Sequence, residues 1–299
     1  MLEYGLPFAF TVLVWWASTG AILYLDGLPR RTYPRTMIAT TLLAALAIWG
    51  MWYSSGQTTV AGAYCGFTCA ILIWAWQEVA FLLGYLTGSR RTPCPEGARG
   101  WRRARYAFDA VAHHELALVF LAIAVVMATW DRPNHTGLWT YLVLWTMRQS
   151  AKLNVFLGVR NLNADFLPEH LKYLQTYFVR APMNPLLPVS VAAATLVSVP
   201  LWLAATAPGA SAFAIASTTL VASLLSLAIL EHLLLVLPLP AERLWSWGMR
   251  SHEATGRAAA ALRAAAPTPA DVPIVAAIAP PPARHWRRRD PGDAPRSWR

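Results

Sequence analysis

The chain has 299 residues, of which 56% are hydrophobic and 13% charged, and its formal net charge is +10 at pH 7. Its apolar residues form long blocks, which excludes an ordinary soluble domain and a disordered chain. It also excludes an outer-membrane barrel, whose strands alternate polar and apolar residues over about 10 positions. The sequence therefore predicts an all-α, polytopic membrane helix bundle.

Seven apolar blocks are long enough to be transmembrane helices, because a helix needs about 20 residues to cross ~30 Å of hydrocarbon. The first block follows the start MLEY, which has no basic residue, and this predicts an uncleaved anchor rather than a signal peptide. The seven predicted spans cover 6–22, 37–53, 62–86, 108–130, 138–156, 186–204 and 212–237.

The basic residues predict the orientation of these spans. All of them except Arg132 belong to the loops and span ends that follow the first, third, fifth and seventh blocks. Lys and Arg beside short loops stay on the cytoplasmic side, so we expect a periplasmic amino terminus and a cytoplasmic carboxyl terminus in a bacterial inner membrane. Anionic lipid then accounts for the positive charge, and we expect no nucleic-acid partner, even for the motif HWRRRD around Arg288.

Two segments outside the spans carry predictions of their own. Apolar residues recur on one face at about 165–180, after the helix-initiating Pro168, which indicates either an interfacial amphipathic helix or a solvated loop helix. Residues 1–250 would thus form the membrane domain. The Ala-, Pro- and Arg-rich tail, 251–299, has few bulky apolar residues and is predicted to be disordered.

Ionisable residues inside three apolar blocks define a candidate site, because a charge in a span is costly and usually functional. At a rise of 1.5 Å per residue, these groups lie in one layer about 8 to 12 Å below the inner surface. The fifth block brings two cations, one helical turn apart, to nearly the same level. The predicted polar layer contains Glu78, His113, His114, Glu115, Arg148, Lys152, Glu231 and His232.

Three interpretations of this layer remain open. In the first, Glu78 and Glu231 neutralise Arg148 and Lys152 in a structural ion-pair network. His114 is then hydrogen-bonded among them. In the second, carboxylates and imidazoles hold a di-metal centre. Against the second, neighbouring residues such as Glu231 and His232 diverge by about 100° around a helix, unlike the Glu-x-x-His pairs of such centres. The metal-ligand candidates are Glu78, His114, Glu115, Glu231 and His232.

The third interpretation is a pigment site. A neutral imidazole of His114 or His232 could ligate the magnesium of a chlorin such as bacteriochlorophyll, or the carboxylates could bind a polar group of the pigment. Tryptophans near mid-span offer flat surfaces for the ring of a pigment. They are Trp15, Trp16, Trp74 and Trp76.

The chain resembles one family over residues 1 to 249. The resemblance rests on the motifs VWWASTGAILYLDGLPRRT, TTVAGAYCGFTCAILIWAWQE, PCPEGARGWRR, HELAL, MRQSAKLNVFLGVRNLNADFLPEHLKYL and LEHLLLVLPLP. It identifies the PuhE family, photosynthetic complex assembly protein 2, of anoxygenic phototrophic bacteria, which is encoded beside the gene for the reaction-centre H subunit.

The resemblance implies a role in assembling the photosynthetic reaction centre with its core antenna, and in bacteriochlorophyll levels, with the subunits of these complexes as partners. It implies no catalytic residue. A membrane metalloenzyme that acts on a pigment or isoprenoid is the alternative, and a transporter is a third class that intramembrane charges would allow.

Overall fold

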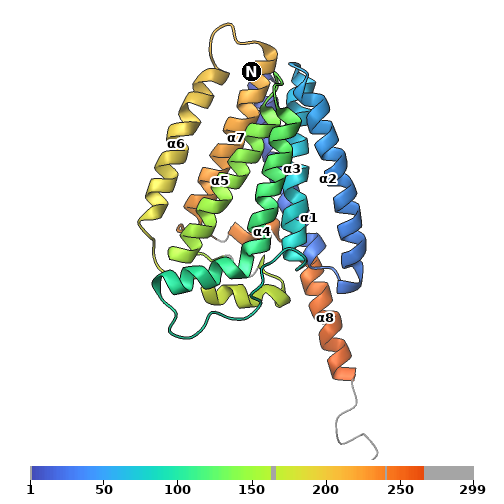
Figure 1. Cartoon of the computed structure of the whole chain (residues 1–299), viewed down its shortest axis with the longest axis vertical. Helices are drawn as coiled ribbons and strands as arrows, with labels where there is room; N and C mark the ends of the chain where they lie inside the picture. The colour runs from blue at the N-terminus through green and yellow to red at the C-terminus, as the bar shows by residue number, and fades with distance from the viewer. Residues whose placement is uncertain (1, 163–165, 240, 266–299) are drawn as a thin grey trace, which may run out of the picture. The chain divides into compact units, whose positions relative to one another are not determined.

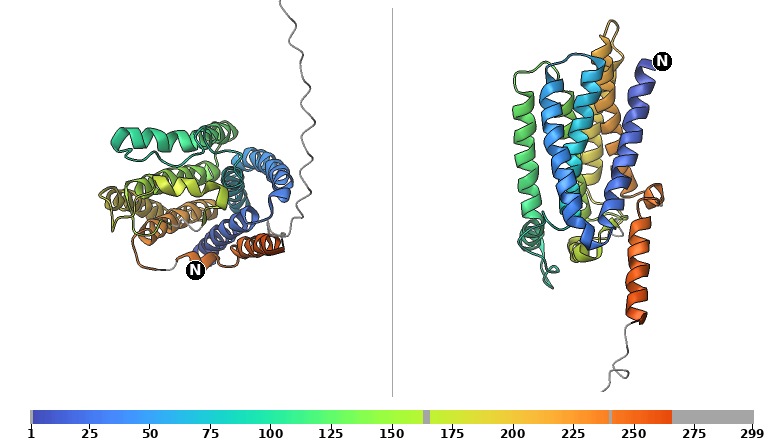
Figure 2. Two further views of the ribbon diagram at one scale, coloured as in Figure 1. Left: turned by 90° about the horizontal axis from the view of Figure 1, so that it is seen from below. Right: turned by 90° about the vertical axis from the view of Figure 1, so that its right-hand side faces the viewer.

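The computed structural model describes residues 2–162, 166–239 and 241–265, and the chain is all-α in this part. The long helices α1 to α7 run roughly parallel within residues 1–258 (Figures 1 and 2). Their bounds are Leu2–Asp26 (α1), Tyr33–Ser55 (α2), Val60–Leu82 (α3), Gly100–Thr129 (α4), Thr136–Leu157 (α5), Leu186–Ala205 (α6) and Ala212–Leu234 (α7). Shorter elements are the 3₁₀ helices η1 (Arg30–Thr32), η3 (Glu169–Tyr177) and η4 (Ala241–Trp245), and the helix α8 (Arg250–Ala265).

Six of the helices, all except α5 among α1 to α7, are long and apolar enough to cross a membrane. Their large apolar side chains point outward, as Leu42, Phe120 and Leu196 do at 67%, 68% and 75% exposure. Apolar surface on this scale requires lipid rather than water around it. The chain is therefore a multi-pass membrane protein.

The helix α5 is less apolar than its neighbours α3 and α7, although its 22 residues are long enough to span. Seven spans were expected, and α5 accounts for the difference because Arg148, Gln149, Lys152 and Asn154 lower its hydropathy. It nevertheless packs against α3, α4 and α7. The helix α5 thus lies among the other long helices of the bundle.

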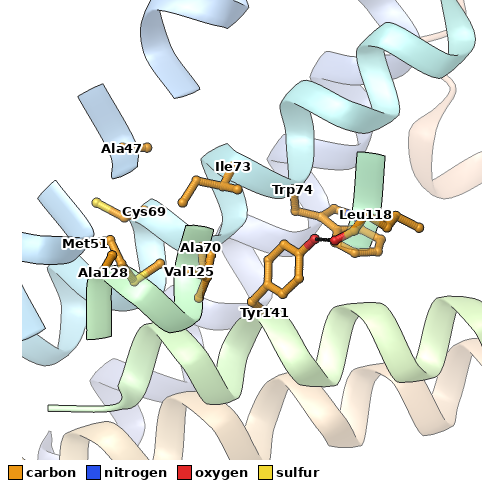
Figure 3. Packing of buried hydrophobic residues seen from close by; sticks show 10 residues of the cluster. All are labelled: Ala47, Met51, Cys69, Ala70, Ile73, Trp74, Leu118, Val125, Ala128 and Tyr141. Carbon is orange, nitrogen blue, oxygen red and sulfur yellow. Dashed lines mark hydrogen bonds between the residues drawn. The ribbon is translucent and has the colours of Figure 1, made fainter. Parts of the chain in front are cut away.

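The helix α3 is the centre of the bundle, since it packs against α1, α2, α4, α5 and α7. Small residues let the helices approach closely: a Cβ on Gly137 of α5 would lie 2.8 Å from the carbonyl oxygen of Gly66 in α3. Next to this contact, the fully buried Tyr141 donates its hydroxyl hydrogen to the Leu118 carbonyl oxygen of α4 at 2.8 Å (Figure 3). The two contacts fix α5 against α3 and α4.

The segment after α5 forms the 3₁₀ helix η3. An amphipathic helix was predicted here, at about 165–180. Residues 163–165 lie outside the described part. Its apolar side chains Leu171, Leu174 and Tyr177 are buried against the end of α3 and the start of α4. Arg103 of α4 fixes this packing, because it donates to the carbonyl oxygens of Phe156 at 2.7 Å and Tyr177 at 2.5 Å.

The segment that follows α7 returns to α1. Trp16 of α1 donates to the Leu244 carbonyl oxygen at 2.8 Å, and Trp245 donates to the Trp16 carbonyl oxygen at 3.1 Å. Gly20 is required at this crossing, because a Cβ there would lie 2.0 Å from the Trp247 ring. The helix α8 then continues to Ala265, where alanine favours helix, within the tail for which disorder was predicted from 251 onward. Residues 266–299 lie outside the described part.

Candidate functional site

A cavity of about 710 Å³ lies between α1, α3, α4, α5 and α7. We call it the central cavity. Residues of the loop around η3 and of η4 also line it. Its volume falls within the range of ~300–1,000 Å³ that is usual for small-molecule and cofactor sites. Most of its wall is apolar, and the aromatic residues in the wall are Trp15, Trp74, Phe81, Phe108, Phe156, Phe166, Tyr177, Phe178 and Trp245.

An ion pair between α3 and α5 forms one polar part of the cavity wall. Arg148 Nη2 donates to Glu78 Oε2 at 3.1 Å, and the Glu78 side chain is 8% exposed, whereas Arg148 is 45% exposed. A buried carboxylate requires such a partner, because an unpaired charge in an apolar interior is costly. The more accessible guanidinium retains further N–H donors that a ligand could use.

A second polar group joins α4 and α5. Lys152 Nζ lies 2.7 Å from Glu115 Oε1, and Gln149 donates to the other oxygen of the same carboxylate. Gln149 and Lys152 are three residues apart and therefore share a face of α5. Both oxygens of Glu115 are thus occupied.

Glu231 differs from the other two carboxylates of the cavity. It accepts a hydrogen bond of 2.6 Å from Trp15 Nε1 of α1, and within the described residues it has no ion-pair partner. The ring of Trp245 packs edge-on against that of Trp15, with centroids 5.2 Å apart. Glu231 lines the cavity, and its second carboxylate oxygen has no hydrogen-bond partner among the described residues.

The three histidines of the predicted layer do not line the central cavity. His114 is 1% exposed and packs against the Phe81 ring, with centroids 4.6 Å apart. His232 is hydrogen-bonded through Nδ1 to the Ala228 carbonyl oxygen and through Nε2 to Ser150 Oγ, both at 2.9 Å. His113 is exposed on another face of α4.

The structure thus divides the predicted layer. It brings Glu78, Glu115, Arg148, Lys152 and Glu231 around one cavity, and it places the imidazoles elsewhere. Across the part of the chain that the structure describes, no three His, Cys, Asp or Glu side chains are grouped closely enough to hold a metal ion.

Of the four tryptophans predicted to offer flat surfaces, two line the cavity, and some other groups of the site were not predicted from the sequence. Trp15 and Trp74 line the cavity as flat surfaces, whereas Trp76 donates to Thr41 at 2.9 Å and Trp16 binds the segment after α7. Gln149 was missed, although its position one turn before Lys152 indicates a shared face. The location of Trp245 could not be inferred, because its contact with α1 spans more than 200 residues of sequence.

Comparison with known proteins assigns the family. The profile of a family described as a protein of unknown function, DUF3623, matches residues 1–256. The chain belongs to the DUF3623 family. The match includes every element around the central cavity, so the cavity lies within the region that defines DUF3623.

A relative of known source is found in Rhodobacter capsulatus. It is described as an uncharacterized 30.4 kDa protein in the puhA 5′ region, and it is 35% identical over 268 residues, which cover 88% of this chain and 96% of the relative. No solved structure matches the DUF3623 chain described above.

Proposed function

We propose that this protein is an assembly factor for the photosynthetic reaction centre and its core antenna, and that it holds bacteriochlorophyll or a related pigment in the central cavity. The observation that carries this proposal is an apolar, aromatic-walled cavity of about 710 Å³ that contains one carboxylate without an ion-pair partner. The description of the R. capsulatus relative, which mentions puhA, supports the photosynthetic context.

The residues of the cavity suit a chlorin as cargo. Aromatic side chains such as Trp15, Trp74 and Phe81 provide flat apolar surfaces against which a macrocycle can stack. The free oxygen of Glu231 is suited to a magnesium ion or to a hydroxyl donor of the pigment. Arg148, whose guanidinium is partly exposed, is suited to a carbonyl substituent. No histidine is required for these contacts.

The topology that we propose has seven spans, with α5 as the seventh. The ion pairs of α5 with Glu78 and Glu115 support this, because paired charges cost less inside a membrane than isolated ones. The distribution of Lys and Arg supports a periplasmic amino terminus, a cytoplasmic carboxyl terminus and location in the inner membrane. The basic cytoplasmic loops would then meet lipid and the reaction-centre or antenna subunits rather than nucleic acid.

The proposal is tested by filling the central cavity with a larger side chain. Ala75 lines the cavity on α3, so Ala75→Phe places a ring inside it, and Ala193→Phe adds the same ring on the exposed surface of α6 as the matched control. Each protein is purified in mild detergent from a phototrophic host that lacks the native gene. Absorption spectra measure the retained pigment, and the same strains report the level of assembled reaction centre.

We expect the wild type and Ala193→Phe to retain bacteriochlorophyll bands and to restore assembly. Ala75→Phe should lose both, because the cavity volume is occupied. If the wild type retains no pigment and Ala75→Phe restores assembly fully, the cavity is not the working site. If Ala75→Phe loses assembly but the wild type retains subunits without pigment, the cargo is protein and the pigment proposal is overturned.

A further inference from the structure

A second cavity, of about 270 Å³, lies at the end of the bundle where α3 ends and η1 and η3 begin. We call it the basic pocket. It shares no lining residue with the central cavity. It lies beyond the ends of α1 and α3 and beside Arg30, the first residue of the candidate span Arg30–Ser55, so we infer that it lies near the polar headgroups at the membrane surface.

The charge of the basic pocket is positive. Arg30 and Arg91 line it, and none of its lining residues is acidic. Arg91 donates only a long hydrogen bond, 3.4 Å, to the Gly84 carbonyl oxygen, and Arg30 has no ion-pair partner among the described residues. The nearby carboxylate of Asp26 is paired with His252 and does not line the pocket.

The positive charges of the two arginines affect the pKa of a neighbouring histidine, His170. Burial lowers the pKa of His170, the charges of Arg30 and Arg91 lower it further, and the Leu82 carbonyl opposes them. An anion that enters the pocket would therefore meet two guanidinium groups beside an imidazole, with no competing carboxylate in the lining.

Polar groups in the same pocket have few partners. Thr87 is 1% exposed, and its hydroxyl interacts with that of Tyr173. Among the described residues, neither hydroxyl has a further hydrogen-bond partner, and the His170 Nε2 atom has none. Buried hydroxyl groups usually make more than one hydrogen bond in folded proteins when the geometry allows it. Several incompletely paired groups around one small space indicate a ligand that accepts hydrogen bonds.

We propose that the basic pocket binds a phosphate group. Arginine pairs with phosphate oxygens through charge-assisted hydrogen bonds, and the hydroxyls of Thr87 and Tyr173 supply neutral donors. The pocket is smaller than a typical cofactor site, which suits a headgroup better than a nucleotide. The phosphate belongs either to an anionic phospholipid, which basic pockets between spans commonly bind, or to a soluble phosphate.

The test uses the full-length protein in nanodiscs of phosphatidylcholine. Phosphatidylglycerol is added to the discs in one arm and inorganic phosphate to the buffer in the other, and the thermal unfolding midpoint is followed against the concentration of each probe. The charge variant is Arg30→Gln with Arg91→Gln. Arg31→Gln with Arg99→Gln is the matched control, since both of these arginines are exposed outside the pocket and the charge removed is equal. Thr87→Val tests the hydroxyl without a change of charge.

We expect one probe to stabilise the wild type saturably. Its half-saturating concentration should rise about tenfold or more in the charge variant and should change little in the control. A response to phosphatidylglycerol alone identifies the lipid as the source, and a response to inorganic phosphate identifies a soluble anion. If the charge variant and the control respond equally, or if Thr87→Val binds as the wild type does, the stabilisation reflects surface charge and the pocket is not a phosphate site.

Discussion

Replacing Lys152 by Met should destabilise the protein through the carboxylate that it leaves behind. Lys152 Nζ lies 2.7 Å from Glu115 Oε1, with side-chain exposures of 28% and 18%. At an effective dielectric constant of about 20, the attraction between unit charges at this distance is about 6 kcal/mol before desolvation. Desolvation offsets much of it, and water in the cavity screens part of the remainder. We therefore expect Lys152→Met to cost about 2–3 kcal/mol.

The coupling is measured by a double-mutant cycle with Glu115→Gln, using unfolding in mixed detergent micelles followed by circular dichroism. Removing both charges should cost less than the sum of the single changes, with a coupling energy of about 1–2 kcal/mol. Lys172 and Glu169 are the matched control, because this pair is 2.5 Å apart but 51% and 84% exposed. The same substitutions there should couple by less than about 1 kcal/mol. Additive effects at Lys152 and Glu115 would refute our view that the cavity is a low-dielectric environment.

Three further predictions concern the packing and the pH dependence of the fold. Tyr141→Phe should cost about 1 kcal/mol, because the hydrogen bond from the Tyr141 hydroxyl to the Leu118 carbonyl oxygen is lost; the same change at Tyr53, which is 55% exposed, should have no measurable effect on unfolding. Gly137→Ala should cost about 1–3 kcal/mol, since its Cβ would lie 2.1 Å from Met51 Sδ; an equal loss for Gly5→Ala, where nothing lies within 4 Å, would disprove this cause. The hydrogen bond to Asp26 raises the pKa of His252, so its contribution is present below the ordinary value of about 6.5 and is lost as pH rises through the raised value. His252→Gln should therefore lower the melting temperature more at pH 6 than at pH 8, and an equal loss at both would contradict the ion pair.

The sequence predicted the axial positions of the site residues better than their orientations. Apolar block lengths located the helices, and a rise of 1.5 Å per residue placed the ionisable groups at one level. The direction in which each side chain points depends on how the helices are rotated against one another. Glu115 faces the cavity while its neighbour His114 packs against Phe81, and no feature of either residue type decides between them.

Two other features depend on contacts between distant parts of the chain. The apolar residues Leu167, Leu171, Leu174 and Phe178 gave an amphipathic pattern, but the local sequence does not specify whether this face contacts lipid or the bundle. The structure packs it against α3 and α4. The hydrogen bond between Trp15 and Glu231 joins residues separated by 216 positions. Only the assembled bundle specifies such a pair.

The crossing of Trp245 and Trp247 over α1 has a consequence for biosynthesis. The helix α1 leaves the ribosome first, and the residues that complete the wall beside Trp15 leave it only after all seven long helices. During membrane insertion the wall of the central cavity beside Trp15 therefore stays incomplete until translation has passed residue 247. Trp245, whose ring packs edge-on against that of Trp15, is the last residue of the cavity wall to be synthesised.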